Sequence, residues 1–132
     1  QAIKGNQDDS NLRPSINSCP PEIIPEPYYL GVLEHLSGLR LSSPILIEGG
    51  YVELEVSPRR LAFKRTHASG ELIVLINGEK NPTAFLINEK NPNAIWVDMT
   101  NPQENSYRVE NGKIKVTVDA NWGKVLKLQS SF

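Results

Sequence analysis

The sequence has little of what cross-linking, metal binding or membrane insertion requires. It has a single cysteine, Cys19, so the chain cannot form an internal disulfide. Its two histidines, His35 and His67, are not spaced as a metal-binding pair, and no CxxC motif is present. No apolar run approaches the roughly 20 residues that a membrane-spanning helix needs. We therefore expect no metal, no cofactor and no membrane partner.

The chain also lacks an excess of either charge. It has 14 basic and 15 acidic side chains, which give a net charge of −1. A nucleic acid is recognised through a concentrated positive field, so none is an expected partner. The 132 residues suit one domain of ordinary size. The chain begins at Gln1 without an initiator methionine or a signal peptide, so we expect a processed chain or a cut fragment.

Proline is concentrated near the N-terminus, where five of the ten prolines fall between residues 14 and 27. Proline removes backbone donors and restricts the residue before it, which predicts an irregular N-terminal segment over residues 1–27. A helix is predicted over residues 27–38, because Pro27 suits a first helical turn and apolar residues follow at helical spacing. Gly38 is its predicted end.

The predicted helix is apolar on more than one side, since Leu30 and Leu39 lie outside its main apolar stripe. A helix of this kind is usually covered on two faces. The sequence offers no second helix to cover it. We therefore expect this helix to contact protein that lies outside the chain.

From Gly49 onward the apolar period changes to two, which is typical of β-strands. Val52, Leu54 and Val56 alternate with polar positions, which predicts a strand with one wet face. Residues 72–76 are continuously apolar and favour a central strand. Asn111-Gly112 is a strong hairpin signal. Eight strands are predicted in all, near residues 51–56, 61–66, 72–76, 83–87, 94–99, 107–110, 113–118 and 124–128. The fold predicted is mainly β, an antiparallel Greek-key β-sandwich of about eight strands preceded by one helix.

No group of residues in the sequence predicts a catalytic site. Most carboxylates fall in predicted turns or on wet strand faces. Glu53 and Glu55 are expected to point the same way, yet no cleft is predicted around them. Cys19 has no obvious base nearby, and no serine lies in a G-x-S-x-G elbow.

Exposed aromatic rings are the better signal for a sugar, because the C–H faces of sugars stack on them. Trp96 continues an apolar strand and is predicted to lie in the core. Trp122 lies in a turn before the last strand and is the candidate sugar contact. Large rings usually bury most of their area, so burial of Trp122 is the alternative.

Six stretches resemble, in order, the carboxyl end of the α-amylase superfamily of glycoside hydrolases. Residues 28–46 resemble the last barrel helix with its "LRxxSPxL" exit, and residues 48–51 resemble the "xGxY" entry to the next domain. Residues 61–65 and 72–77 resemble the "lAFxR…LVVLN" strand pair of that domain. Residues 111–118 and 124–128 resemble its closing hairpin, so the resemblance covers residues 28–128.

The N-terminal stretch from Asp8 to Pro14 is similar to the "DPxNxRxP" segment that follows the last barrel strand in this family. That segment lies near the substrate groove, so the resemblance implies sugar contacts at Asp8, Asn11 and Arg13, besides Trp122. Two positions depart from the pattern, and a tryptophan expected soon after is missing. The resemblance therefore implies the family fold with an altered substrate contact.

The resemblance implies that residues 1–44 are the tail of a catalytic barrel and residues 45–132 a C-terminal β-sandwich domain. The catalytic carboxylates of the family lie on earlier barrel strands, so this chain alone is not expected to catalyse. A parent glycoside hydrolase acting on α-glucans is implied. The domain would pack on the barrel, or on another chain, through the helix at 27–38, and assist α-glucan binding. An independent carbohydrate-binding module and a structural or adhesion sandwich without sugar function are the two alternatives.

Overall fold

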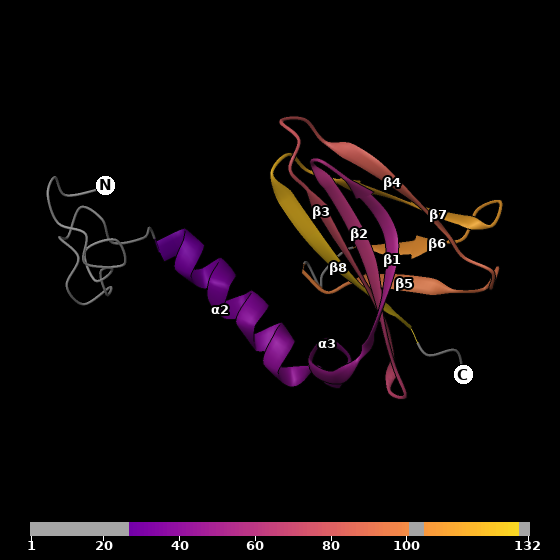
Figure 1. Ribbon diagram of the computed structural model, residues 1–132, viewed down its shortest axis with the longest axis horizontal. Coiled ribbons are helices and arrows are strands. Elements are labelled where there is room, and N and C mark those ends of the chain that lie inside the picture. The colour runs from indigo at the N-terminus through magenta and orange to yellow at the C-terminus, as the bar shows by residue number, and fades with distance from the viewer. Residues whose placement is uncertain (1–26, 101–104, 130–132) are drawn as a thin grey trace, which may run out of the picture. The chain divides into compact units, whose positions relative to one another are not determined.

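The computed structural model describes residues 27–100 and 105–129, which contain two helices and eight strands (Figure 1). The chain divides into two units, residues 1–35 and residues 36–132, and all eight strands belong to the second. The predicted irregular segment lies outside the described residues, except for Pro27 at its end.

Helix α2 spans Pro27–Ser42 and is longer than the sequence predicts. It begins at Pro27 as expected, but the prediction that it ends at Gly38 is wrong. Glycine weakens a helix by about 1 kcal/mol without ending it. Pro44 ends it instead, because it holds Ser43 in an extended conformation with φ −111° and ψ 107°.

A second short helix, α3, spans Pro44–Glu48 and was not predicted. Ser43 caps it, since the Ser43 hydroxyl accepts a hydrogen bond from the Leu46 N–H. Pro44 occupies the first turn, where its missing N–H costs nothing. Ile45 is buried, and α3 packs against the strands β2 and β3.

The eight strands form two antiparallel sheets (Figure 1). The larger sheet has the order β1-β2-β3-β8-β5-β6, and the smaller one pairs β4 with β7. Because β8 lies between β3 and β5, the order departs from a simple meander. Eight strands in two antiparallel sheets confirm the predicted β-sandwich. The strands are β1 Gly50–Ser57, β2 Arg60–His67, β3 Gly70–Asn77, β4 Thr83–Asn88, β5 Ile95–Asp98, β6 Ser106–Arg108, β7 Lys113–Val118 and β8 Trp122–Leu128.

The core lies between the two sheets. Trp96 is fully buried there, as its position in an apolar strand predicted. Lys64 Nζ lies 5.5 Å from the centre of a Trp96 ring, and Glu89 accepts a hydrogen bond of 3.2 Å from the indole N–H. The core cluster comprises Ala62, Ile73, Leu75, Phe85, Ile87, Ala94, Trp96, Ile114, Val116, Val118 and Leu126.

Strand β1 does not have the single wet face that its alternating pattern predicted. The register with β2 shifts between Glu53 and Glu55, which marks a β-bulge. An extra residue reverses the facing of everything beyond it, so Val52 and Val56 point to opposite faces. Both valines are exposed, whereas Leu54 is half-buried.

The hairpin predicted at Asn111-Gly112 is correct as a turn and wrong as a strand pairing. Both residues have positive φ, 52° and 76°, which a tight hairpin turn requires. Only one bridge, Glu110 with Lys113, closes the turn. β6 then pairs with β5 and β7 with β4, so the two arms enter different sheets.

Candidate functional site

Trp122 is the sequence-predicted sugar contact that the structure describes. It begins β8, where it pairs with Asn77 of β3, and 38% of its surface is exposed. The residue before it, Asn121, has a φ of 51°, and its N–H donates to the Glu79 carbonyl. Trp122 therefore offers part of its ring to solvent from a turn with a defined conformation.

Asn77 holds the chain beside Trp122. Its side chain is buried, and its amide nitrogen donates toward three carbonyl oxygens at 3.0 to 3.1 Å, those of Asn81, Val118 and Asp119. Its amide oxygen accepts a hydrogen bond of 2.8 Å from the Glu79 N–H. One side chain thus joins the turn before β4 to the turn before β8.

The other predicted sugar contacts, Asp8, Asn11 and Arg13, lie outside the described residues, as does Cys19. Their roles as sugar contacts stay predictions from the resemblance alone.

The sequence alternation predicted that the two carboxylates of β1 point the same way, and this prediction is wrong. The bulge places Glu53 opposite Phe63, whereas Glu55 is opposite Ala62, which faces the core. Glu55 pairs with Arg60, whose Nε lies 2.7 Å from its Oε1. These two acids therefore cannot act together on one bond.

Among the residues that the structure describes, neither histidine belongs to a cluster of potential metal ligands. His67 contacts the Ser69 hydroxyl through Nδ1 at 2.8 Å, and its Nε2 lies 3.8 Å from a Glu48 oxygen. His35 is exposed on α2. Within residues 27–100 and 105–129, no three His, Cys, Asp or Glu side chains come together as metal ligands. In the same ranges, no helix is both long enough and apolar enough to cross a membrane.

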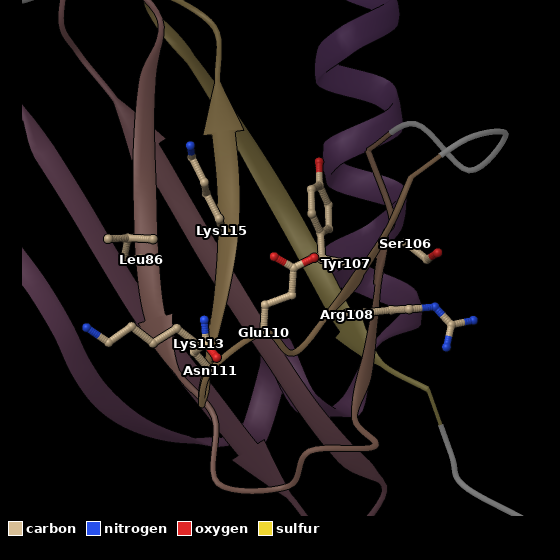
Figure 2. A pocket seen from close by; sticks show the side chains of 8 residues that line it. All are labelled: Leu86, Ser106, Tyr107, Arg108, Glu110, Asn111, Lys113 and Lys115. Atoms are coloured by element: carbon tan, nitrogen blue, oxygen red, sulfur yellow. The ribbon is translucent and has the colours of Figure 1, made fainter.

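A groove of about 530 Å³ lies where β6 and β7 leave each other to join different sheets. Figure 2 shows the eight side chains that line it, from β4, β6, the Asn111 turn and β7. We call it the β6–β7 groove. Tyr107 forms part of one side, and Leu86, with 59% of its surface exposed, lies on another.

A buried ionic group supports Tyr107 from behind. Lys124 Nζ donates a hydrogen bond of 2.9 Å to the Tyr107 hydroxyl and lies 3.5 Å from Asp98 Oδ2. Only 1% of the Asp98 surface is exposed, and its other oxygen accepts hydrogen bonds from the Thr100 N–H and hydroxyl. Burial lowers the pKa of Lys124, but Tyr107 and the Asp98 charge outweigh it, so the pKa is raised and the lysine stays charged.

The larger sheet carries a second apolar surface on the side away from the core. Side chains alternate along a strand, so the neighbours of core residues such as Ile73 and Leu75 point outward. Ile76 is 43% exposed there, and the Tyr51 ring lies 5.2 Å from that of Phe63. We call this set the outer apolar patch: Tyr51, Val56, Leu61, Phe63, Val74, Ile76, Val97 and Val125.

One end of the larger sheet's outer side is covered by α3. Ile45 and Leu72 are both buried, although neither belongs to the core cluster. A cavity of about 210 Å³ remains beside them, lined also by Leu39, Met99 and Val125. The cover therefore reaches only part of this side of the sheet.

Sequence reasoning missed the β6–β7 groove and the ionic group behind it. Asp98 ends an apolar strand and Lys124 follows a glycine, so each has the appearance of an ordinary surface charge. One signal in the sequence could have found Asp98. Side chains two residues apart in a strand share a face, so Asp98 faces the same side of β5 as the core residue Trp96. Pairing of β5 with β8, which brings Lys124 to this face, is not visible in the sequence.

No protein-family model matches this sequence, and no curated protein matches it either. Solved structures do match its fold. An Anoxybacillus α-amylase superposes with a TM-score of 0.70 at 17% identity, over 81% of this chain and 24% of that one. An α-amylase from Geobacillus thermoleovorans, solved in complex with acarbose, gives a TM-score of 0.72 at 16% identity over the same shares.

A third match is a noncanonic maltogenic α-amylase, AmyB, from Thermotoga neapolitana. It gives a TM-score of 0.65 at 14% identity, over 82% of this chain and 27% of that enzyme. The chain thus spans about a quarter of the length of these enzymes. Part of each of these α-amylases therefore shares the fold of this chain.

Proposed function

We propose that this chain is the C-terminal part of an α-amylase-like glycoside hydrolase. In this proposal, residues 45–132 form a non-catalytic β-sandwich domain that packs on a catalytic barrel, and residues 1–44 are the tail of that barrel. The fold likeness supports it, and so does the fact that the matched enzymes are about four times as long as the matched segment. Hydrolysis of α-glucans then belongs to the parent enzyme.

The outer apolar patch is the observation that carries the proposal. An antiparallel sheet with one face in water normally presents polar side chains on that face. Here Ile76, Val56 and Tyr51 are exposed on the outer side of a sheet whose other side already holds the core. A contiguous apolar surface of this kind marks a protein contact. A barrel belonging to the same enzyme is the occupant that the fold likeness supports.

Helix α2 gives independent support, because none of its 16 residues is buried. Its sequence predicted cover on two faces. Its exposed large apolar residues are Tyr28, Tyr29, Leu30, Leu33, Leu36 and Leu41. Such a helix needs partners beyond the described residues, as the tail of a barrel would have.

The test is a docking experiment. The segment encoded upstream of Gln1 is expressed as a separate chain and mixed with this one, and binding is followed by sedimentation velocity. We expect a one-to-one complex that Ile76→Asp weakens at least about tenfold, since a buried charge without a partner costs well over 1.4 kcal/mol.

Leu86→Asp is the matched control, because Leu86 is an equally apolar, exposed residue on the smaller sheet. It should leave docking unchanged. An upstream segment that folds into no barrel, or a complex that Ile76→Asp does not weaken, would contradict the proposal. A complex with an unrelated partner instead would favour the structural or adhesion sandwich.

The proposed α-glucan contacts are Asp8, Asn11, Arg13 and Trp122. The partial exposure of Trp122 supports its place in this set, since a ring with a free face can stack on a sugar. In an independent carbohydrate-binding module, these contacts would suffice without a barrel.

A further inference from the structure

We propose that the β6–β7 groove is a second α-glucan site, separate from Trp122, with Tyr107 as its wall and Glu110 as its main acceptor. The assignment to an α-glucan rests on the proposed function. The assignment to a neutral sugar rests on the groove itself.

The groove is formed by elements of both sheets. Tyr107 comes from β6 of the larger sheet, Leu86 and Lys115 come from the smaller one, and the Asn111 turn connects them. Its volume of about 530 Å³ is within the range of small-ligand sites. It is an open depression, which suits a chain-like ligand that enters from the side.

The Tyr107 side chain is held in place before any ligand arrives. Its hydroxyl accepts the hydrogen bond from Lys124, whose charge is balanced by buried Asp98. Lys124 Nζ also lies 5.6 Å from the centre of the tyrosine ring. A ring fixed by buried groups loses little conformational entropy on binding, which favours a weak, stacking ligand such as a sugar.

The Glu110 carboxylate is free to accept hydrogen bonds. It makes no hydrogen bond or ion pair through this group with any residue in the described part of the chain, although its backbone pairs with Lys113. Figure 2 shows it beside Tyr107, between the two sides of the groove, with the Arg108 guanidinium pointing away.

The mixture of groups distinguishes a sugar from an anion. Lys113, Lys115 and Asn111 offer donors, whereas Glu110 offers only acceptors. Each sugar hydroxyl both donates and accepts, so it needs both kinds of partner. A phosphate or carboxylate could pair with the two lysines, but Glu110 would repel it and could not serve as its partner.

The groove is also distinct from the Trp122 position. Trp122 is not among the residues that line the groove, and it begins β8 opposite Asn77, whereas Tyr107 registers with Trp96. Variants at the two places therefore report on different sites.

The experiment titrates maltoheptaose into the full chain and measures binding by calorimetry and by two-dimensional NMR. We expect a millimolar to micromolar Kd and shift changes at Tyr107 and Glu110. Glu110→Ala should weaken binding at least about tenfold, because a hydrogen bond to a charged acceptor is lost. Glu110 is exposed, so the variant should retain the melting temperature of the parent.

Glu53→Ala is the matched control, an exposed carboxylate on β1, and should leave the Kd unchanged. Four results would overturn the proposal: no binding of maltoheptaose, binding that Glu110→Ala leaves intact, binding that only Trp122→Ala removes, or displacement by inorganic phosphate. Preference for cellohexaose would overturn the α-glucan assignment. The docking test of the proposed function uses Ile76→Asp, whereas the sugar-binding test uses Glu110→Ala. Either test can therefore fail while the other succeeds.

Discussion

Asn77 connects two turns through a single side chain, and both turns depend on its amide. Its nitrogen donates toward carbonyl oxygens of residues 81, 118 and 119, and its oxygen accepts a hydrogen bond from the Glu79 N–H. With only 1% of its surface exposed, water cannot replace these partners. The conformation of the chain around Trp122 is therefore set by a residue that no ligand touches.

Replacing Asn77 should be costly to stability. We expect Asn77→Ala to lower the free energy of unfolding by about 2 to 4 kcal/mol, because buried carbonyls and an N–H lose their partners. Asn77→Asp should also destabilise the fold, since it places a charged oxygen against three carbonyl oxygens. Urea unfolding followed by circular dichroism measures both.

Asn88→Ala provides the reference, because Asn88 ends β4 and is exposed. It should change the free energy of unfolding by less than about 0.5 kcal/mol. If Asn77→Ala lowered the free energy of unfolding by no more than Asn88→Ala does, the two turns would be stable without the Asn77 amide.

Single residues were predictable from the sequence where one local pattern decided their environment. Trp96 lies within an apolar strand, and its burial is confirmed. Asn77 and Asp98 are as deeply buried, but each ends a strand, where polar residues usually meet water. Each also has a partner more than 25 residues away in the sequence, Val118 for Asn77 and Lys124 for Asp98, which the sequence does not reveal.

At the scale of elements, the junction between α3 and β1 depends on Gly49. A Cβ there would overlap the Ile45 carbonyl oxygen and come within 3.1 Å of the Thr66 carbonyl oxygen. The Gly49 N–H itself donates to Ile45, which closes α3. The backbone angles, φ −61° and ψ 151°, suit any residue, so the demand for glycine is one of space alone.

Two glycine-to-alanine variants should therefore have opposite effects. Gly49→Ala should lower the melting temperature, because backbone atoms that it meets cannot move aside. Gly38→Ala lies in the middle of α2 with no atom within 4 Å of its new Cβ, and should add up to about 1 kcal/mol of helix stability.

Circular dichroism melts of the two variants measure this difference. A Gly49→Ala protein as stable as the parent would mean that α3 shifts freely on the sheet. A loss of helix content in Gly38→Ala would mean that Gly38 interrupts α2 after all.

The predicted elements are correct where residues near in sequence determine them. All eight strands appear close to their predicted positions, and Pro27 begins a helix. The bulge in β1 and the parting of the chain at Asn111 were not predicted, because each is set by pairing with another strand. Helix α2 ends at Ser42 and not at the predicted Gly38, since Pro44 constrains the backbone before it more than a glycine does.

At the scale of the whole molecule, the outer apolar patch should make the separate chain adhesive. We expect association that increases with concentration and binding of an apolar dye, because exposed apolar surface gains free energy when it is removed from water. The double variant Val56→Thr and Ile76→Thr should reduce both. Analytical ultracentrifugation and dye fluorescence measure them.

Leu86→Thr, on the smaller sheet, is the control and should leave association nearly unchanged. Equal effects of the two sets of variants would mean that the patch has no special part in contacts. A chain that stays monomeric and binds no dye would contradict the expectation directly.

The site was less predictable than the fold. The motifs indicated a C-terminal domain of an α-amylase-like enzyme, and part of each matched α-amylase does share the fold of this chain. The β6–β7 groove escaped detection because Tyr107, Glu110 and Lys124 belong to three elements whose pairing is nonlocal. Strand periodicity gives the facing of each strand, and it contains no information on which strands are neighbours.

The place of β8 has a consequence for the order in which the protein is made. This last strand lies in the interior of the larger sheet and joins β3 to β5, with Leu72 paired to Lys127 and Trp96 to Leu128. During synthesis, the strands made earlier must wait for β8 before their sheet can close. A chain that stops before Trp122 would therefore leave the larger sheet as two unjoined parts, and synthesis of β8 is the step that commits these strands to their native pairing.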